Sequence, residues 1–228
     1  MKKYDIFLFD ADDTLYDFTL SSANALRVMF EYCGFEYSDK VQATYWEINA
    51  QAWASYEKGE ISVEELQRVR FARLFNNVGV SHDIEDFNAR YLYELGCGAF
   101  LLEGTRSICR EIVANNKQVY IVTNGLIATQ EARAKQSPIA KYISEVFASE
   151  AIGYQKPDKE FFNYVCAHIT DACKSQMLII GDSLRADVVG GNNAGIDTCW
   201  FNAHGADNPM SIKPTYEIQK LSQLRQFI

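Results

Sequence analysis

The segment FLFDADDTL, residues 7–15, constrains the fold of this chain more than any other. Apolar residues run directly into a cluster of acids, as in a buried strand whose carboxyl end reaches a ligand site. Just past a strand end the chain turns, so the side chains of Asp10 and Asp12 can converge on one point. Carboxylates that close repel each other unless a cation lies between them. The segment therefore predicts a metal site with oxygen ligands, most economically for Mg²⁺.

The same acids also have a plain structural explanation. Aspartate is a common turn residue, and a lone Asp-x-Asp after a strand usually does no more than end the strand and begin a turn. The metal-site interpretation therefore depends on polar residues elsewhere in the chain.

Composition excludes several classes of protein. The chain has 228 residues, of which 48% are hydrophobic, enough for a substantial core. Its net charge of -8 argues against binding to polymeric nucleic acid or to an anionic membrane. No apolar run approaches the roughly 20 residues of a membrane span. The 6 cysteines are scattered without a Cys-x-x-Cys pair, so we expect a reduced cytoplasmic protein. We also expect a monomer or weak homodimer.

Amphipathic helical patterns follow one another from residue 21 to residue 95. Gly34 is placed to end the first pattern, and Ser62-x-x-Glu65 is a capping box that begins the third. A crossover between neighbouring strands normally needs one helix, so this run predicts an all-helical insertion. The second pattern carries a stripe of Trp46, Asn49, Trp53 and Tyr56. This stripe could stack on a base or belong to the core of the insertion, and the sequence does not decide between them.

Strands alternate with helices again after Gly104. The predicted strands cover residues 118–123, 146–148, 177–180 and 198–201. Such alternation predicts a parallel sheet with right-handed crossovers and helices on both faces. We expect a doubly wound, Rossmann-like α/β core of residues 1–16 and 97–228, with an inserted helical cap of residues 17–96.

Polar residues stand at the ends of further predicted strands. Thr123 and Asn124 precede a glycine and could cradle an anion. Lys156 precedes a predicted helix, and Asp182 and Asp187 follow the fourth strand of the core. Each signal alone has an ordinary explanation as a turn, a solvated lysine or a helix cap. Their occurrence together in this order, all at strand ends, is much less expected by chance than any one of them alone.

With these motifs the chain resembles the haloacid dehalogenase-like (HAD) phosphohydrolases. The letters DADDT at residues 10–14 match their first motif, Thr123 the second, Lys156 the third, and GDSLRAD at residues 181–187 the fourth. The resemblance runs from residue 4 to about residue 203 and includes a helical cap inserted after the first motif. A narrower resemblance, to the YjjG-type pyrimidine 5′-nucleotidases, is concentrated in residues 9–15, 123–125 and 190–204.

The resemblance implies a role for each motif residue. Asp10 is the nucleophile that forms an aspartyl-phosphate. Asp12 protonates the leaving alcohol and later takes a proton from the hydrolytic water. Lys156 stabilises Asp10 and the transferring phosphoryl group. Thr123 and the backbone N–H of Asn124 bind other phosphoryl oxygens.

The resemblance also implies a set of metal ligands. Mg²⁺ is held by Asp10, by the backbone carbonyl of Asp12 and by Asp182. Thr14 and Asp187 support the site from behind, and Asp187 orients Lys156 or water on the metal.

The implied function is hydrolysis of a small phosphomonoester, most specifically a pyrimidine nucleoside 5′-monophosphate. Tyr16 and Phe18 come directly after the catalytic turn and are expected to contact this substrate. Asp12 favours phosphoester hydrolysis over dehalogenation, because a departing halide needs no proton. The alternatives are a small sugar-phosphate or phosphoglycolate-type phosphatase, a phosphomutase, or a catalytically silent protein that binds a phosphorylated ligand.

Overall fold

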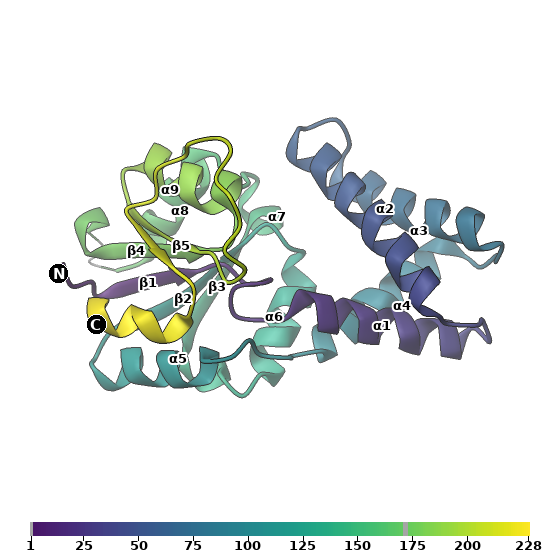
Figure 1. Cartoon of the computed structure of the whole chain (residues 1–228), viewed down its shortest axis with the longest axis horizontal. Coiled ribbons are helices and arrows are strands. Elements are labelled where there is room, and N and C mark those ends of the chain that lie inside the picture. Colours follow the sequence, from purple (N-terminus) through teal and green to yellow (C-terminus); the bar gives the residue numbers. More distant parts are fainter. Residues whose placement is uncertain (1, 171–172) are drawn as a thin grey trace. The chain divides into compact units, whose positions relative to one another are not determined.

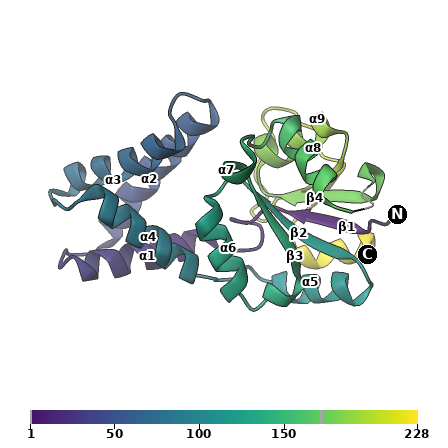
Figure 2. The ribbon, with the colours of Figure 1, turned by 180° about the vertical axis from the view of Figure 1, so that it is seen from behind.

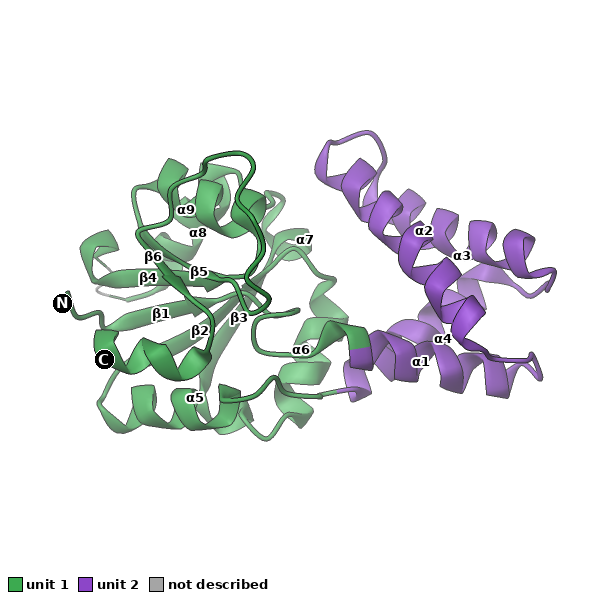
Figure 3. Ribbon diagram, viewed as in Figure 1, with its two compact units in different colours: residues 1–19, 99–228 green, residues 20–98 purple. Residues whose placement is uncertain are grey.

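The computed structural model describes residues 2–170 and 173–228. The chain forms two compact units, residues 1–19 with 99–228 and residues 20–98 (Figure 3). The boundaries predicted after residues 16 and 96 fall three and two residues before the observed ones, after 19 and 98. Among the described residues, no helix combines the length and the apolar character needed to cross a membrane.

The first unit is built on a parallel sheet, which confirms the predicted fold class. Within the described chain the sheet has 6 strands in the order β3-β2-β1-β4-β5-β6, and Figure 2 shows β3 at one edge beside β2. The strands are β1 (Ile6–Phe9), β2 (Gln118–Thr123), β3 (Ile143–Ala148), β4 (Met177–Gly181), β5 (Asp197–Phe201) and β6 (Tyr216–Ile218). Every pairing is parallel, and Phe9 of β1 is in register with Ile121 of β2 and Ile180 of β4. Strand β6 was not predicted.

Helices cover both faces of this sheet. They are α5 (Thr105–Ala114), α6 (Ile127–Gln136), α7 (Ser149–Ile152), α8 (Lys159–His168) and α9 (Val189–Ala194), with short turns η1 (Ala140–Tyr142), η2 (Lys174–Gln176), η3 (Leu184–Val188, π-helical) and η4 (Leu221–Phe227). In Figure 1, α8 and α9 lie on one side of the strands, and α5 and the C-terminal η4 lie on the other.

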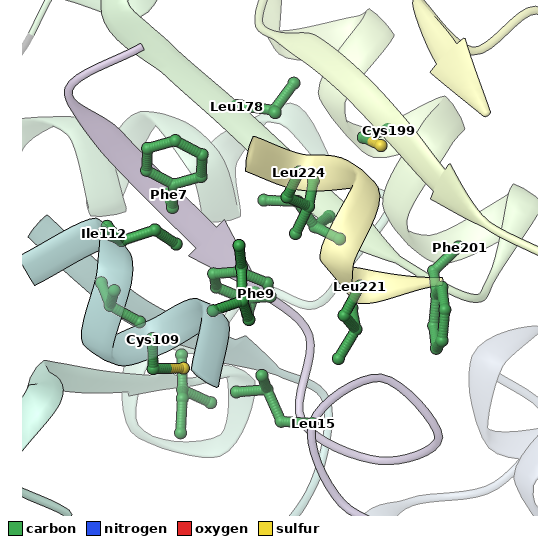
Figure 4. Packing of buried hydrophobic residues seen from close by; sticks show 14 of the residues in the cluster. Phe7, Phe9, Leu15, Cys109, Ile112, Leu178, Cys199, Phe201, Leu221 and Leu224 are labelled. Carbon is green, nitrogen blue, oxygen red and sulfur yellow. The ribbon is translucent and has the colours of Figure 1, made fainter. Parts of the chain in front are cut away.

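Alternation along β1 explains these two layers. Successive side chains of a strand point to opposite faces. Phe7 and Phe9 belong to the buried cluster that includes residues of α5 and η4 (Figure 4). Leu8 belongs to the opposite cluster, with Phe161 and Val165 of α8. Because β1 is buried on both faces, its carboxyl end has a fixed position in the middle of the sheet.

The second unit is helical, as predicted. Its helices are α1 (Phe18–Tyr32), which begins in the first unit, α2 (Asp39–Glu57), α3 (Val63–Val78) and α4 (Ile84–Cys97). Aromatic rings fill its centre: Phe71 lies 5.6 Å from Tyr45 and 5.1 Å from Tyr91, measured between ring centroids. The predicted capping box is present, with the Ser62 and Glu65 side chains each accepting from the other residue's backbone N–H.

The aromatic stripe of α2 lies at the margin of this unit. Asn49 is buried, whereas Trp46, Trp53 and Tyr56 are half-buried. The rings of Trp53 and Tyr56 meet edge to face with centroids 5.7 Å apart. Whether this partly covered stripe also contacts a substrate stays an open prediction.

A matched pair of substitutions tests how far the sheet depends on its helical layers. Val165 of α8 is fully buried, whereas Val113 of α5 is 36% exposed. We expect Val165→Ala to lower the free energy of unfolding by about 2 kcal/mol, and Val113→Ala to change it by less than about 1 kcal/mol. The gain in helix propensity from valine to alanine is common to both variants, so the difference measures burial. Urea denaturation followed by circular dichroism would show equal effects if α8 were not part of the core.

Candidate active site

Asp10 and Lys156 form the centre of the site. Asp10 follows β1 directly, and its backbone N–H donates to the carbonyl of Ile180 on β4 at 2.8 Å. Lys156 is only 2% exposed and donates from Nζ to Asp10 Oδ1 at 2.6 Å, to Asp187 Oδ1 at 2.7 Å and to the Val122 carbonyl at 2.9 Å. The ammonium group thus joins the ends of β1, β2 and β4.

This arrangement displaces the pKa values of both partners. Burial raises the pKa of Asp10 to about 7, although the positive charge of Lys156 opposes the change. Burial alone would lower the pKa of Lys156, but the charges of Asp10 and Asp187 outweigh it and raise this pKa above its usual value. Lys156 is therefore a permanent cation, and one lysine does not fully compensate the acids around it.

The end of β4 supplies the acids Asp182 and Asp187. The backbone of Asp182 is fixed on both sides, since its N–H donates to Thr14 Oγ1 at 3.2 Å and its carbonyl accepts from Trp200 Nε1 at 2.8 Å. Asp187 Oδ2 accepts from the Ser183 N–H at 3.1 Å. A Cβ on Gly181 would lie 2.0 Å from Asp187 Oδ2, so glycine is needed there for Asp187 to reach Lys156.

The chemistry of this acidic cluster fits a hard divalent cation. One carboxylate oxygen from each of Asp10, Asp182 and Asp187 lies within 4.8 Å of the others. Desolvation by the surrounding protein, followed by the charge of Asp10, raises the pKa of Asp182 to about 8. Asp187 already accepts from Lys156 and Ser183, so Asp10 and Asp182 are the carboxylates best placed to bind a metal.

Thr123 and Asn124 follow β2 beside Lys156. Thr123 Oγ1 accepts from the Gly125 N–H at 3.0 Å. The Asn124 side chain pairs with the backbone of Lys156, accepting from its N–H at 2.8 Å and donating to its carbonyl at 2.9 Å. The side chain of Asn124 therefore positions Lys156, a role that the sequence analysis did not foresee. Its backbone N–H remains the predicted phosphoryl contact.

Asp12 lies near this centre but its carboxylate points to α6. Oδ2 accepts from Gln130 Nε2 at 2.7 Å, and Oδ1 accepts from Arg133 Nη1. Neither Gln130 nor Arg133 was predicted to take part in the site. A signal existed: they stand three residues apart on the helix that directly follows Thr123, so they share one of its faces.

The structure corrects the prediction for Tyr16. This side chain is 0% exposed and its ring lies 5.2 Å from the guanidinium carbon of Arg133, so Tyr16 packs inside the protein and does not face a substrate. Phe18 is half-buried, and its backbone N–H donates to Asp13 Oδ1 at 3.2 Å. Asp13 itself has a left-handed backbone with φ 56, which produces the sharp turn between Asp12 and Phe18.

A cavity of about 530 Å³ opens beside Asp182 within the first unit. Its walls include Asp13, Trp200 and His204, from the turn after β1, from β5 and from the loop that follows β5. This volume is in the range of small-molecule sites. The cavity therefore provides room for a metabolite next to the acidic cluster.

In doubly wound α/β enzymes, functional groups gather at the carboxyl edge of the parallel sheet, and the buried lysine joined to carboxylates lies at that edge here. A family model of haloacid dehalogenase-like hydrolases matches residues 4–195. The chain belongs to this family, as its motifs predicted.

Three relatives match over almost their whole length. The HAD-hydrolase YfnB of Bacillus subtilis is 39% identical over 227 residues, covering 98% of this chain and 95% of the relative. The pyrimidine 5′-nucleotidase PynA of Streptococcus pneumoniae is 36% identical over 221 residues (97% and 93%). The pyrimidine 5′-nucleotidase YjjG of Escherichia coli is 31% identical over 226 residues (99% and 98%). A crystal structure of YfnB bound to magnesium superposes with a TM-score of 0.91 at 38% identity, covering 99% of this chain and 98% of that one.

The contrast between two acids tests the electrostatics of the site. In excess chelator at pH 8, we expect Asp182→Asn to raise the free energy of unfolding, because it removes a carboxylate that is disfavoured beside Asp10. The gain should be only about 0.5–1 kcal/mol, because solvent screens this carboxylate. Asp187→Asn should lower it by about 1–3 kcal/mol, because two donors lose a charged acceptor. Mg²⁺ should stabilise the parent protein but not Asp182→Asn. Thermal unfolding would contradict this account if both variants shifted in the same direction.

Proposed function

We propose that this protein is a Mg²⁺-dependent phosphomonoesterase that hydrolyses pyrimidine nucleoside 5′-monophosphates through an aspartyl-phosphate on Asp10. The observation that carries the proposal is the contact of Lys156 with Asp10 Oδ1 at 2.6 Å. It fixes the carboxylate at the end of β1, while the described residues place no hydrogen-bond donor on Oδ2. A held carboxylate with one free oxygen is suited to nucleophilic attack.

The phosphoryl group would be met by a few fixed positive or polar groups. Lys156 contributes a permanent charge beside the nucleophile, and Thr123 contributes a hydroxyl at the end of the neighbouring strand. Asp10, Asp182 and the backbone carbonyl of Asp12 would hold Mg²⁺, which offsets the charge of the phosphate when it is bound. Asp12 would give a proton to the leaving alcohol and then take one from the attacking water.

The relatives support the choice of substrate. PynA and YjjG are both pyrimidine 5′-nucleotidases by name, and each matches at least 97% of this chain. The cavity beside Asp182 is large enough for a nucleoside, and the residues that line it include Trp200 and His204. Aromatic faces bind bases by stacking with little selection among them, so we expect only a modest preference among pyrimidines.

The cellular setting is part of the same proposal. All 6 cysteines lie in the described part of the chain and are free, which supports a reducing compartment such as the cytoplasm. A monomer or a weak homodimer remains our prediction for the assembly.

The covalent step is tested by a conservative change of the nucleophile. Asp10→Asn removes the charge of the carboxylate with little change in volume, so the fold should persist while turnover falls below about 1% of the parent value. Phosphate release from p-nitrophenyl phosphate measures activity, and circular dichroism measures folding. Excess chelator should silence the parent enzyme, and Mg²⁺ should restore it. Substantial activity in the purified variant would refute the aspartyl-phosphate.

The substrate class is tested by a panel at matched concentration. We expect dUMP, dTMP and UMP to be hydrolysed with kcat/KM values at least about tenfold above those of ribose 5-phosphate, glucose 6-phosphate and phosphoglycolate, a difference of about 1.4 kcal/mol in transition-state binding. Sugar phosphates hydrolysed equally well would replace the nucleotidase proposal with a general sugar-phosphate phosphatase. Exchange of the phosphoryl group between sugar positions without phosphate release would identify a phosphomutase.

A further inference from the structure

Two side chains of α6 hold both oxygens of the Asp12 carboxylate. Gln130 Nε2 donates to Oδ2 at 2.7 Å, and Arg133 Nη1 donates to Oδ1. Arg133 is 0% exposed, whereas the Asp12 side chain is 29% exposed. The donors thus lie inside the protein, and the carboxylate lies between them and the open side of the site.

The charge of Arg133 has few other partners. Asp12 is its sole ion-pair partner in the described part of the chain, and the ring of Tyr16 lies 5.2 Å from its guanidinium carbon. Arg133 Nε and Nη2 have no hydrogen-bond partner among the described residues. A buried guanidinium with a single carboxylate partner interacts strongly with it, because no other charge is there to replace that partner. Arg133 therefore holds one oxygen of Asp12 through its sole ion pair among the described residues, while Gln130 holds the other oxygen.

The local backbone also supports this contact. A Cβ on Gly125 would lie 2.4 Å from Gln130 Nε2, so the glycine leaves room for the amide that reaches Asp12. Gly125 comes two residues after Thr123, whose hydroxyl accepts its N–H. The predicted phosphate cradle and the two donors to Asp12 are consequently parts of one turn and helix.

We propose that Gln130 and Arg133 are positioning residues that set the direction of the Asp12 carboxylate for proton transfer. This inference rests on the proposed function. When the Asp10 oxygen bonds to phosphorus and the bond from phosphorus to the leaving oxygen breaks, the Asp12 O–H proton passes to that leaving oxygen. Arg133 and Gln130 then hold the carboxylate that remains. In the second step water attacks phosphorus, its proton passes to Asp12, and Asp10 is released as a carboxylate.

The leaving group separates this role from a merely structural one. An alkyl phosphate needs a proton on its departing oxygen, whereas p-nitrophenolate departs without one. The value of kcat/KM reports events through the first phosphoryl transfer, so it isolates the acid step. We expect Arg133→Met to lower kcat/KM for dUMP by about 10- to 100-fold, no more than the low end of the roughly 10²–10⁴-fold that a general acid contributes, because the acid itself is retained. For p-nitrophenyl phosphate the loss should stay below about threefold.

Three further variants protect the test against a folding defect. Gln130→Met removes one donor but keeps the buried ion pair, and it should show the same leaving-group dependence with a smaller loss. Gln136→Met, at the exposed end of the same helix, should leave kcat/KM unchanged for both substrates. Arg133→Lys keeps the charge and should recover part of the dUMP activity. Equal losses on both substrates, or no loss on either, would overturn the inference.

The failure of the proposed function would look different. If the parent hydrolysed neither substrate, or if Asp10→Asn stayed active, the proposed mechanism and this inference would both be overturned. If the parent acted on p-nitrophenyl phosphate but not on dUMP, the nucleotidase proposal would fail alone, and ribose 5-phosphate would take the place of dUMP as the alkyl substrate. A parent active through Asp10, with equal losses in Arg133→Met, would overturn only the role of Arg133.

Discussion

The contact between the Lys156 ammonium group and the carboxylates of Asp10 and Asp187 is the interaction on which the rest of the site depends. Removing three charged groups from water costs several kcal/mol each unless their geometry is good and their hydrogen bonds are satisfied. Here Nζ donates to Asp10, to Asp187 and to the Val122 carbonyl, which uses all the donors of an ammonium group. The three acceptors come from the ends of β1, β2 and β4, and β1 lies between the other two strands in the sheet. The strand order therefore allows all three donors of Lys156 to be paired.

The residues around this contact form hydrogen bonds mainly with the backbones of Lys156 and Asp182, not with their side chains. Asn124 pairs with the backbone of Lys156, while Thr14 and Trp200 fix the backbone of Asp182 on its two sides. The carboxylates and the ammonium group are then free to use their polar atoms on one another or on a ligand. Supporting hydrogen bonds of this kind keep an active site in one geometry before the substrate arrives.

The sequence was sufficient to predict the parts of the site that depend on local patterns. Apolar runs followed by acids identified β1 and β4 and placed Asp10 and Asp182 at one edge of the sheet. It was insufficient where a polar residue is buried against a partner far along the chain. Gln130 and Arg133 lie on a helix with few apolar residues, and periodicity does not tell which of its polar positions are buried. Tyr16 was assigned to the substrate because it comes directly after the catalytic turn, although that turn carries it into the interior.

The turn after β1 gives two neighbouring carboxylates opposite surroundings. Asp10 lies among acids and one lysine, where burial raises its pKa to about 7, whereas Asp12 is held by an amide and a guanidinium from α6. Ala11 between them is fully buried, and the left-handed backbone of Asp13 turns the chain immediately afterwards. Different environments are what allow similar acids to take different chemical roles. In the proposed mechanism, a single stretch of chain would therefore supply both the carboxylate that attacks phosphorus and the carboxylate that exchanges a proton.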